Sequence, residues 1–348
     1  MTTIYFEENF TFSPKFFALC RSLGTRFALV CDAEIAKLFG EKLQNRMREE
    51  GLAVDLFSFP PGEVSKCRAV KERLEDEMIH EGHAKDSCLI AMGGGVALDL
   101  AGFLASTYCR GIPLLMVPTT LLAMVDAAIG GKNGVNVAHA KNWIGTIYPP
   151  SAICIDPLFL RSLPKEEWNN GKVEMLKHGL VADRDHFEKL VQGEITPELI
   201  KESIAIKLHI TGKDEWEVSG LRRVLNFGHT IGHALEKLFH YAVAHGKAVA
   251  YGILVETFIS EESGYLSSSS CKTIVQAIKR YVPKVTFENQ ALISSISLDK
   301  KALAGKPRFV LLEEIGRAKS FDGDWCTYVE MEELITALKR ADHVVHSS

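Results

Sequence analysis

The chain has 348 residues, of which 47% are hydrophobic and 24% charged, and its 40 basic and 44 acidic side chains give a formal net charge of -4. At roughly 100 to 200 residues per domain, this length predicts about two domains and excludes a peptide or a small module. The composition is that of a folded globular protein and excludes a disordered chain. The near balance of charge, without a run of lysine and arginine, disfavours nucleic-acid binding.

The sequence carries no signal for membrane insertion or secretion. No stretch approaches the ~20 consecutive apolar residues of a membrane helix, and the first residues include Glu7 and Glu8 in place of a basic start followed by an apolar core. The eight cysteines are scattered, without a CxxC pair, which is typical of buried thiols in a reducing compartment. We therefore expect a cytoplasmic protein without a nucleic-acid or membrane partner.

Residues 1–163 alternate short apolar, β-branched runs with helical patterns. The pattern predicts buried strands at 27–31, 54–59, 87–92, 114–117 and 152–155, and helices at 33–50, 67–82 and 96–106. Such alternation favours an α/β domain with a mainly parallel sheet. Ligands of these sheets bind outside the carboxyl ends of the strands.

Residues 164–348 have a different pattern, with helical periodicity from 165 to 300 and few candidate strands. A late strand pair is predicted at 308–312 and 317–321, with a turn through Gly316, and a last amphipathic helix at 331–340. We therefore expect a second, mainly α-helical domain.

Two glycine-rich segments are candidate phosphate sites. AMGGGVALDLAGF (91–103) runs from a predicted strand through three glycines into a helix, where backbone amides and the helix dipole favour an anion. The segment is not GxGxxG, and a tight turn without a nucleotide explains it equally well. AAIGGKNGVN (127–136) places Lys132 among glycines, which suits either a phosphate contact or a solvated surface lysine.

The helical half concentrates histidines. Five of the 12 lie between His209 and His245, and His229 and His233, four residues apart, would share one helix face as two metal ligands do. Thr230 stands where a zinc protease has its glutamate, which disfavours that class. Histidines serving only in the core or on the surface remain the alternative.

A third, acidic metal ligand must come from elsewhere, and Glu174 in NGKVEMLKHGL is the best candidate. Its alternative is a surface ion pair with Lys177, three residues later on the same face. Glycine loops, histidines, Glu174 and scattered cations together suggest a metal and a nicotinamide cofactor acting on a phosphorylated, polyhydroxylated substrate. The cations are Arg110, Lys132, Lys141, Lys207, Arg222 and Lys301.

From about residue 60 to about residue 320 the sequence resembles the sugar phosphate cyclases and, within them, the 3-dehydroquinate synthase family. The resemblance is carried by seven ordered blocks: GGGVALDLAGFLASTYCRG (93–111), VPTTLLAMVDAAIGGKNGVN (117–136), AKNWIGTIYPP (140–150), GKVEMLKHGL (171–180), GLRRVLNFGHTIGHALE (220–236), HGKAV (245–249) and LDKKALAG (298–305). It implies an N-terminal Rossmann-like NAD-binding domain followed by a helical domain that binds a metal and the substrate.

The resemblance also implies residue roles. The metal, Zn²⁺ or Co²⁺, would be bound by Glu174, His229 and His245, with His233 turned to the substrate. NAD would contact residues in the N-terminal half: Gly62, Glu63, Lys66, Gly94, Gly95, Val96, Asp99, Thr119, Thr120, Lys132, Lys141, Phe159 and Ser162. Substrate and catalytic positions would be Asp126, Lys132, Asn142, Lys177, Lys207, Arg222, Asn226, His233 and Lys300 or Lys301, of which we select Lys301. Arg110 would reach the phosphate site of a neighbouring subunit, which implies a homodimer.

The implied reaction converts 3-deoxy-D-arabino-heptulosonate 7-phosphate into 3-dehydroquinate and phosphate, in the shikimate pathway to aromatic amino acids. Alternatives are another cyclase of the superfamily, an NAD- and metal-dependent polyol dehydrogenase, and a non-catalytic NAD-binding relative. The sequence departs from the family pattern at Leu98, Ala127, Ala128, Asn133 and Lys247. A side chain at Leu98, in the phosphate turn, is expected to alter cofactor fit, and Lys247 places a cation near the implied metal ligand His245.

Overall fold

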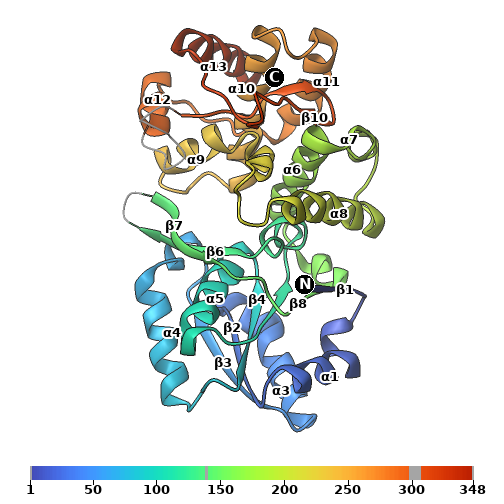
Figure 1. Cartoon of the computed structure of the whole chain (residues 1–348), viewed down its shortest axis with the longest axis vertical. Helices are drawn as coiled ribbons and strands as arrows, with labels where there is room; N and C mark the ends of the chain where they lie inside the picture. Colours follow the sequence, from blue (N-terminus) through green and yellow to red (C-terminus); the bar gives the residue numbers. More distant parts are fainter. Residues whose placement is uncertain (1, 138–139, 298–306, 347–348) are drawn as a thin grey trace. The chain divides into compact units, whose positions relative to one another are not determined.

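The computed structural model describes residues 2–137, 140–297 and 307–346 of the chain (Figure 1). It divides into two compact units, Met1–Pro164 and Lys165–Ser348, which we call the N-terminal and the C-terminal unit. The boundary expected from the sequence lies one residue earlier.

A six-stranded parallel sheet forms the centre of the N-terminal unit. Its strand order is β1-β8-β5-β4-β2-β3, with β1 Thr3–Phe6, β2 Arg26–Asp32, β3 Ala53–Phe59, β4 Ser87–Gly93, β5 Leu114–Pro118 and β8 Ala152–Ile155. Every residue of β4, β5 and β8 is buried. Apart from Ser87 these strands contain no polar side chain, because a parallel sheet is covered on both faces.

Helices lie on both sides of this sheet, with α4 and α5 on one side of the strands and α1 and α3 on the other (Figure 1). They and the short turns between them are α1 Pro14–Leu23, α2 Ala33–Ile35, α3 Glu41–Glu49, α4 Arg68–His80, α5 Gly95–Thr107, η1 Phe10–Phe12, η2 Ala36–Gly40, η3 Glu63–Ser65, η4 Tyr108–Arg110, η5 Ala123–Ala127 and η6 Pro157–Ser162. The α/β class with a parallel sheet, predicted from the alternation of strands and helices, is confirmed.

Three parts of the N-terminal unit were not predicted. They are the edge strand β1, helix α1, and an antiparallel hairpin of β6 Lys132–Val137 and β7 Ala140–Ile147. The hairpin was missed because its glycines and asparagines are depleted in strands and usually indicate turns. Its strands form a sheet separate from the six-stranded one, and the N–H of Asn136 in β6 also donates to the carbonyl oxygen of Lys66 at 2.8 Å.

The described part of the C-terminal unit is mainly helical, as predicted. Its elements are α6 Lys165–Ala182, α7 Arg184–Gln192, α8 Pro197–Lys213, η7 Leu221–Asn226, α9 His229–Leu238, α10 His245–Glu262, α11 Ser268–Ile278, η8 Lys279–Tyr281, α12 Asn289–Ser297, β9 Leu312–Glu314, β10 Arg317–Ala318 and α13 Met331–His346. A late antiparallel strand pair is present as β9 and β10, but β9 shares only Leu312 with the predicted strand 308–312, and β10 ends at Ala318.

Helix α10 lies at the centre of the C-terminal unit. All of its residues from Ala248 to Ser260 are buried, and it packs against α6, α9, α11 and α13. A helix that is buried all round is expected to be the core helix of its domain. The elements around it therefore take their positions from α10.

An ion-pair cluster centred on Asp324 also holds elements of the C-terminal unit together. Arg223 Nη1 donates to Asp324 Oδ1 at 2.9 Å, and Arg308 Nη2 donates to Oδ2 at 2.6 Å. Arg223 belongs to η7, so the cluster joins that turn to the segments around residues 308 and 324. Burial by itself raises the pKa of Asp324, but the hydrogen bonds from Arg308 and Arg223 outweigh it and lower the pKa to about 2.

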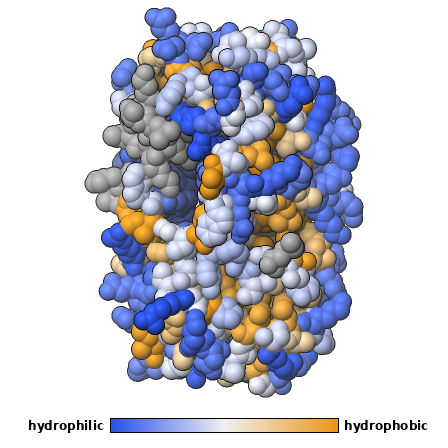
Figure 2. All heavy atoms as spheres, viewed as in Figure 1, coloured by the Kyte–Doolittle hydropathy of each residue, from blue (hydrophilic) through white to orange (hydrophobic). Residues whose placement is uncertain are grey.

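The surface mixes hydrophilic and hydrophobic side chains, as Figure 2 shows for one face. Val64, Val218 and Trp216 are among the most exposed large hydrophobic residues, and scattered exposure of this kind is usual. In the part of the chain that the structure describes, none of the helices is both long enough and apolar enough to cross a membrane.

The Asp324 cluster predicts an acid-dependent loss of stability. Because the pKa of Asp324 is lower in the folded protein than the ~3.9 of an unfolded aspartate, its stabilisation is complete above about pH 5 and is lost as pH falls towards 2. Asp324→Asn should lower the free energy of unfolding by at most about 2 kcal/mol at pH 7 and by about half that amount at pH 3. Urea unfolding at both pH values, with the exposed Asp322→Asn as control, measures the difference. An effect of Asp324→Asn that did not diminish at pH 3 would contradict the assignment.

Candidate functional site

Helix α6 carries two opposite charges into the interior of the C-terminal unit. Glu174 is fully buried and Lys177 is 1% exposed, and the Nζ of Lys177 pairs with the Oε2 of Glu174. The ion pair that the sequence offered as the alternative role of Glu174 therefore exists, but it lies in the interior and not on the surface. Burying two charges is unfavourable unless they are well paired, so this position suggests a use for them.

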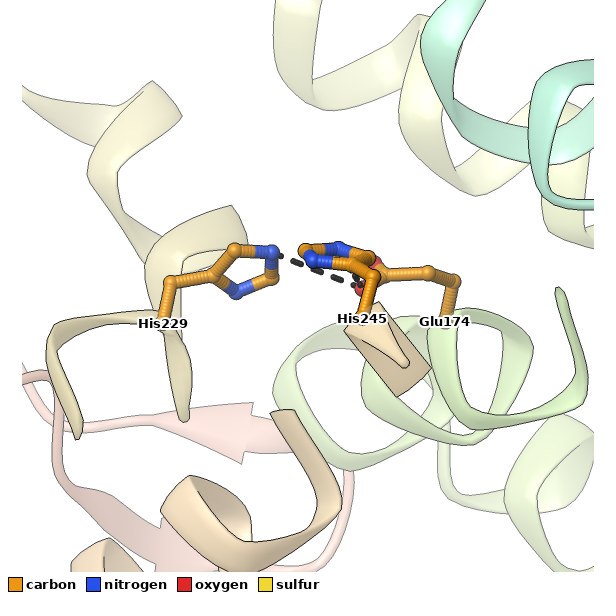
Figure 3. Close-up of side chains that lie close together, drawn as sticks. All are labelled: Glu174, His229 and His245. Carbon is orange, nitrogen blue, oxygen red and sulfur yellow. Dashed lines mark ion pairs between the residues drawn. The ribbon is translucent and has the colours of Figure 1, made fainter. Parts of the chain in front are cut away.

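Two histidines from other helices reach the same carboxylate (Figure 3). His229 is the first residue of α9 and His245 the first residue of α10. Their Nε2 atoms lie 3.4 Å and 3.5 Å from the Oε1 of Glu174. Three helices thus place one carboxylate and two imidazoles around one point.

The histidines reach Glu174 because α10 touches its neighbours backbone to backbone. A Cβ added at Gly246 would lie 2.5 Å from the Cα of Asn170 on α6, and the Oδ1 of Asn170 accepts the Gly246 N–H at 2.9 Å. A Cβ at Gly252 would lie 1.9 Å from the carbonyl oxygen of Gly228. Since Gly246 follows His245 and Gly228 precedes His229, the two contacts fix the starts of both histidine-bearing helices.

The Nδ1 atoms of both histidines also have partners. His229 Nδ1 lies 3.2 Å from the carbonyl oxygen of Phe227, and His245 Nδ1 lies 3.3 Å from the Oε1 of Glu236. A carbonyl or carboxylate oxygen can only accept the Nδ1–H, and in a neutral imidazole bonded in this way Nε2 carries the lone pair that a metal needs.

The three side chains fit a divalent metal. Their ligand atoms all lie within 4.8 Å of one another. Ligand distances of about 2.0–2.1 Å around a tetrahedral ion put neighbouring ligand atoms about 3.3 Å apart, close to the 3.4 Å and 3.5 Å between the Nε2 atoms and Glu174 Oε1. Two histidines and one carboxylate with a position left open are a usual catalytic zinc set.

The pair suggested by spacing, His229 and His233, is not the pair that faces Glu174. The two rings are neighbours, with centroids 5.3 Å apart, but His233 groups with Glu236 and His245 in a second cluster. Helical spacing placed His229 and His233 on one face of α9. The second histidine that faces Glu174 is His245, which belongs to α10.

Buried cations from two further elements complete the predicted set in this unit. Lys207 on α8 is 6% exposed and Arg222 in η7 is 4% exposed, and both elements pack against α6. Arg222 is held by its surroundings, since its Nη1 donates to the carbonyl oxygen of Glu215 at 2.9 Å and its backbone N–H donates to Asp214 at 3.0 Å. Burial tends to raise the pKa of Asp214, but its backbone hydrogen bonds outweigh burial and lower it. Asn226, also predicted, ends η7.

In the N-terminal unit, the predicted cofactor residues follow the carboxyl ends of strands. Gly62, Glu63 and Lys66 come after β3, Gly94, Gly95, Val96 and Asp99 after β4, Thr119 and Thr120 after β5, and Phe159 and Ser162 after β8. This is the edge of an open parallel sheet where ligands bind. The N–H of Thr119 donates to the carbonyl oxygen of Gly93 at 2.9 Å, which joins two of these loops.

Lys66 connects this edge to the hairpin. It is 3% exposed, pairs with Asp99 on α5 and donates to Asn142 Oδ1 at 2.5 Å. Asn142 has a left-handed backbone with φ 51°, a conformation that asparagine tolerates better than most residues. Burial raises the pKa of the Asp99 carboxyl, against the opposing effect of Lys66.

The remaining predicted residues are distributed around the same unit. Lys132 is exposed at the start of β6, Asp126 lies in η5, and Lys141 Nζ lies 3.9 Å from Glu63 Oε1. Arg110 is exposed at the end of η4 with φ 61°. Lys300 and Lys301 lie outside the described residues.

The departures from the family pattern have local explanations. Leu98 is fully buried within the first turns of α5, so its side chain belongs to the core and not to the preceding glycine turn; its effect on cofactor fit stays a prediction. Lys247 pairs with Glu166 at 2.5 Å on the surface. Asn133 joins β6 to β7 by accepting from Thr146 Oγ1 at 2.7 Å.

Sequence reasoning missed three supporting residues: Glu236, Asn170 and Asp214. Glu236 could have been found, because it lies seven residues after His229 and three after His233, at helical spacing. Nothing in the local sequence around Asn170 or Asp214 indicates their partners, which belong to other elements.

Comparison with known proteins adds the following. Residues 56–170 match the family model described as 3-dehydroquinate synthase N-terminal, and residues 171–302 match the one described as 3-dehydroquinate synthase C-terminal. The 3-dehydroquinate synthase of Chlamydia caviae is 37% identical, over 98% of this chain and 96% of the relative. That of Chlorobium chlorochromatii is 36% identical, over 98% and 97%.

Among solved structures, 2-epi-5-epi-valiolone synthase from Streptomyces hygroscopicus, with NAD⁺ and Zn²⁺ bound, matches with a TM-score of 0.86 and 26% identity. The match covers 98% of this chain and 96% of that one.

The close approach at Gly246 can be tested by adding one methyl group. Gly246→Ala would place a Cβ against the backbone of Asn170, and such overpacking costs roughly 1–3 kcal/mol. We expect a lower unfolding temperature and weaker Zn²⁺ binding, because His245 is displaced with α10. Gly212→Ala on α8 is the matched control, since its Cβ meets nothing within 4 Å and alanine favours the helix. Thermal unfolding and Zn²⁺ titration of both variants measure the difference. Equal unfolding temperatures and equal Zn²⁺ affinities in the two variants would argue against a constraint at Gly246.

Proposed function

The chain belongs to the 3-dehydroquinate synthase family, and we propose that it converts 3-deoxy-D-arabino-heptulosonate 7-phosphate into 3-dehydroquinate and inorganic phosphate. The observation that carries the proposal is the meeting of Glu174, His229 and His245 in a unit that also buries three cations. A polyhydroxylated substrate with a phosphate and a carboxylate needs both features.

We assign the metal to Glu174, His229 and His245 in the C-terminal unit, and NAD to the loops after β3, β4, β5 and β8 in the N-terminal unit. NAD⁺ supplies a hydride acceptor that later returns the hydride, and Zn²⁺ or Co²⁺ supplies a Lewis acid that favours ionisation of the hydroxyl being oxidised. The loop amides of Gly94 and Gly95, at the start of α5, are suited to the cofactor's phosphates.

The buried cations Lys177, Lys207 and Arg222 would bind the anionic groups of the substrate. Their positions are set before substrate arrives, Arg222 by Glu215 and Asp214, and Lys177 by Glu174. Charges arranged in advance in a dry site stabilise developing negative charge more than water does. They would favour departure of phosphate, whose own oxygen can accept the proton that elimination releases.

The remaining predicted residues would orient the sugar ring. We assign the relay of the hydroxyl proton to His233, which lies beside both histidine ligands. Asp126, Lys132, Asn142, Asn226 and Lys301 would contact the substrate.

We also propose a homodimer in which Arg110 contributes to the partner's phosphate site, in keeping with the exposure of Arg110. The mass of the protein in solution tests it. A cytoplasmic location is in keeping with eight free cysteines.

The reaction is tested by following two products at once. With NAD⁺, Zn²⁺ or Co²⁺ and the heptulosonate phosphate, we expect inorganic phosphate without net NADH, and more turnovers than NAD⁺ molecules supplied. This result follows because the hydride is returned within each cycle. Net NADH without phosphate would instead establish a polyol dehydrogenase.

The metal ligands are tested by Glu174→Gln. The variant should lose stoichiometric metal and phosphate release, whereas NAD⁺ affinity should stay within about twofold because the cofactor loops belong to the other unit. Glu166→Gln, at the exposed start of the same helix, is the control and should behave as the native protein. Metal analysis, the phosphate assay and NAD⁺ titration give the three readouts; full metal content in Glu174→Gln would refute the ligand assignment.

A further inference from the structure

Glu236 is a buried carboxylate that the proposed reaction does not use. It is 3% exposed and lies on α9, the helix that begins with His229. Its Oε1 lies 3.3 Å from the Nδ1 of His245, which begins the neighbouring helix α10. The carboxylate therefore links the helix of one proposed ligand to the imidazole of the other.

The position of Glu236 decides which nitrogen of His245 is available. When the neutral imidazole donates its Nδ1–H to this carboxylate, Nε2 carries the lone pair, and Nε2 is the atom directed at Glu174. His229 is arranged in the same sense by the carbonyl oxygen of Phe227. The two proposed ligands thus present the same ring atom, one fixed by the backbone and the other by a side chain.

The two ligands differ in how firmly the rest of the molecule holds them. The side chain of His229 is 10% exposed, whereas that of His245 is 24% exposed. A partly exposed imidazole can rotate about two torsions unless something fixes it. Glu236 contacts the ring edge of His245 that is opposite the edge facing Glu174.

We propose that Glu236 is a positioning residue that holds His245 in the Nε2-ligating tautomer and orientation, so that the metal site is formed before the metal binds. This inference rests on the proposed function, because it takes Glu174, His229 and His245 as the ligands. A carboxylate behind a ligating histidine typically contributes 10–100-fold in metal affinity.

A direct ligand role for Glu236 is the competing arrangement. Glu236 also groups with His233 and His245 as a possible metal-binding cluster. However, Glu236 faces Nδ1 of His245 and Glu174 faces Nε2, and one imidazole does not bind one ion through both nitrogens. If Glu236 only positions His245, metal binding requires Glu174. If Glu236 is itself a ligand, metal can be retained without the Glu174 carboxylate, and experiment can separate the two cases.

The test compares Glu236→Ala and Glu236→Gln with the native full-length protein. Zn²⁺ affinity is measured by competition with a chromophoric chelator, and Co²⁺ binding by visible absorption. We expect Glu236→Ala to bind Zn²⁺ 10–100-fold more weakly with one ion still bound per chain, and the Co²⁺ spectrum to keep the intensity of an unchanged ligand number. Glu236→Gln should recover part of the loss, because its amide oxygen can still accept from Nδ1.

Controls separate a positioning effect from general damage. Asp342→Asn removes another carboxylate of the same unit, one that accepts from Tyr251 and Asn289, and should leave Zn²⁺ affinity unchanged. The unfolding temperature of the metal-free proteins shows whether each variant folds. If Glu236→Ala does not fold, the Zn²⁺ affinity of Glu236→Gln is the deciding measurement. A loss of at least threefold in a natively folded Glu236→Gln supports the proposal.

The outcomes also separate this inference from the proposed ligand set. Native Zn²⁺ affinity in both Glu236 variants, with metal lost in Glu174→Gln, would overturn the positioning role and leave the ligand set standing. Loss of stoichiometric metal in Glu236→Gln, with metal retained in Glu174→Gln, would overturn both and make Glu236 a ligand.

Discussion

Helix α10 touches the backbones of α6 and α9 without intervening side chains, and the site depends on that contact. Gly246 lies against Asn170 and Gly252 lies against Gly228, and the two contacts are next to His245 and His229. Since metal chelation tolerates errors of only about 0.5 Å in the position of its ligands, helices separated by ordinary side chains would not bring three ligand atoms together.

The interior of the C-terminal unit holds more charge than a structural core requires. Glu174, Lys177, Glu236 and Glu256 all have side chains that are less than 5% exposed, and buried charges reduce stability unless they are paired. Their partners are one another and the starts of the helices: Glu256 accepts the N–H of Gly228 at 2.8 Å, next to His229. The same residues therefore serve two purposes, since the pairing that offsets their burial also sets the geometry of the histidines.

The N-terminal unit places its residues by a different rule. A parallel sheet ends all its strands at one edge, so the loops after β3, β4, β5 and β8 come together without long-range contacts of their own. Lys66 adds side-chain connections from the β3 loop to Asp99 and to Asn142 on the hairpin.

The sequence by itself determined five of the six strands of the sheet, the helical character of the second half and the family. Each of these depends on patterns within one segment: apolar runs for strands, a 3.6-residue period for helices, and motif blocks for the resemblance. Spacing also placed Glu174 and Lys177, and His229 and His233, on common helix faces. The hairpin of β6 and β7 was not predicted, because its glycines and asparagines indicate turns when no partner strand is known.

Helical spacing did not show which faces meet. The family resemblance implied His245 in place of His233, and the tertiary structure shows the physical arrangement: His245 lies opposite Glu174, Glu236 lies behind His245, and Leu98 is directed into the core. Periodicity describes one helix at a time, whereas these relations arise where two backbones approach closely, and that approach depends on glycines whose importance is visible only when the neighbouring helix is in place.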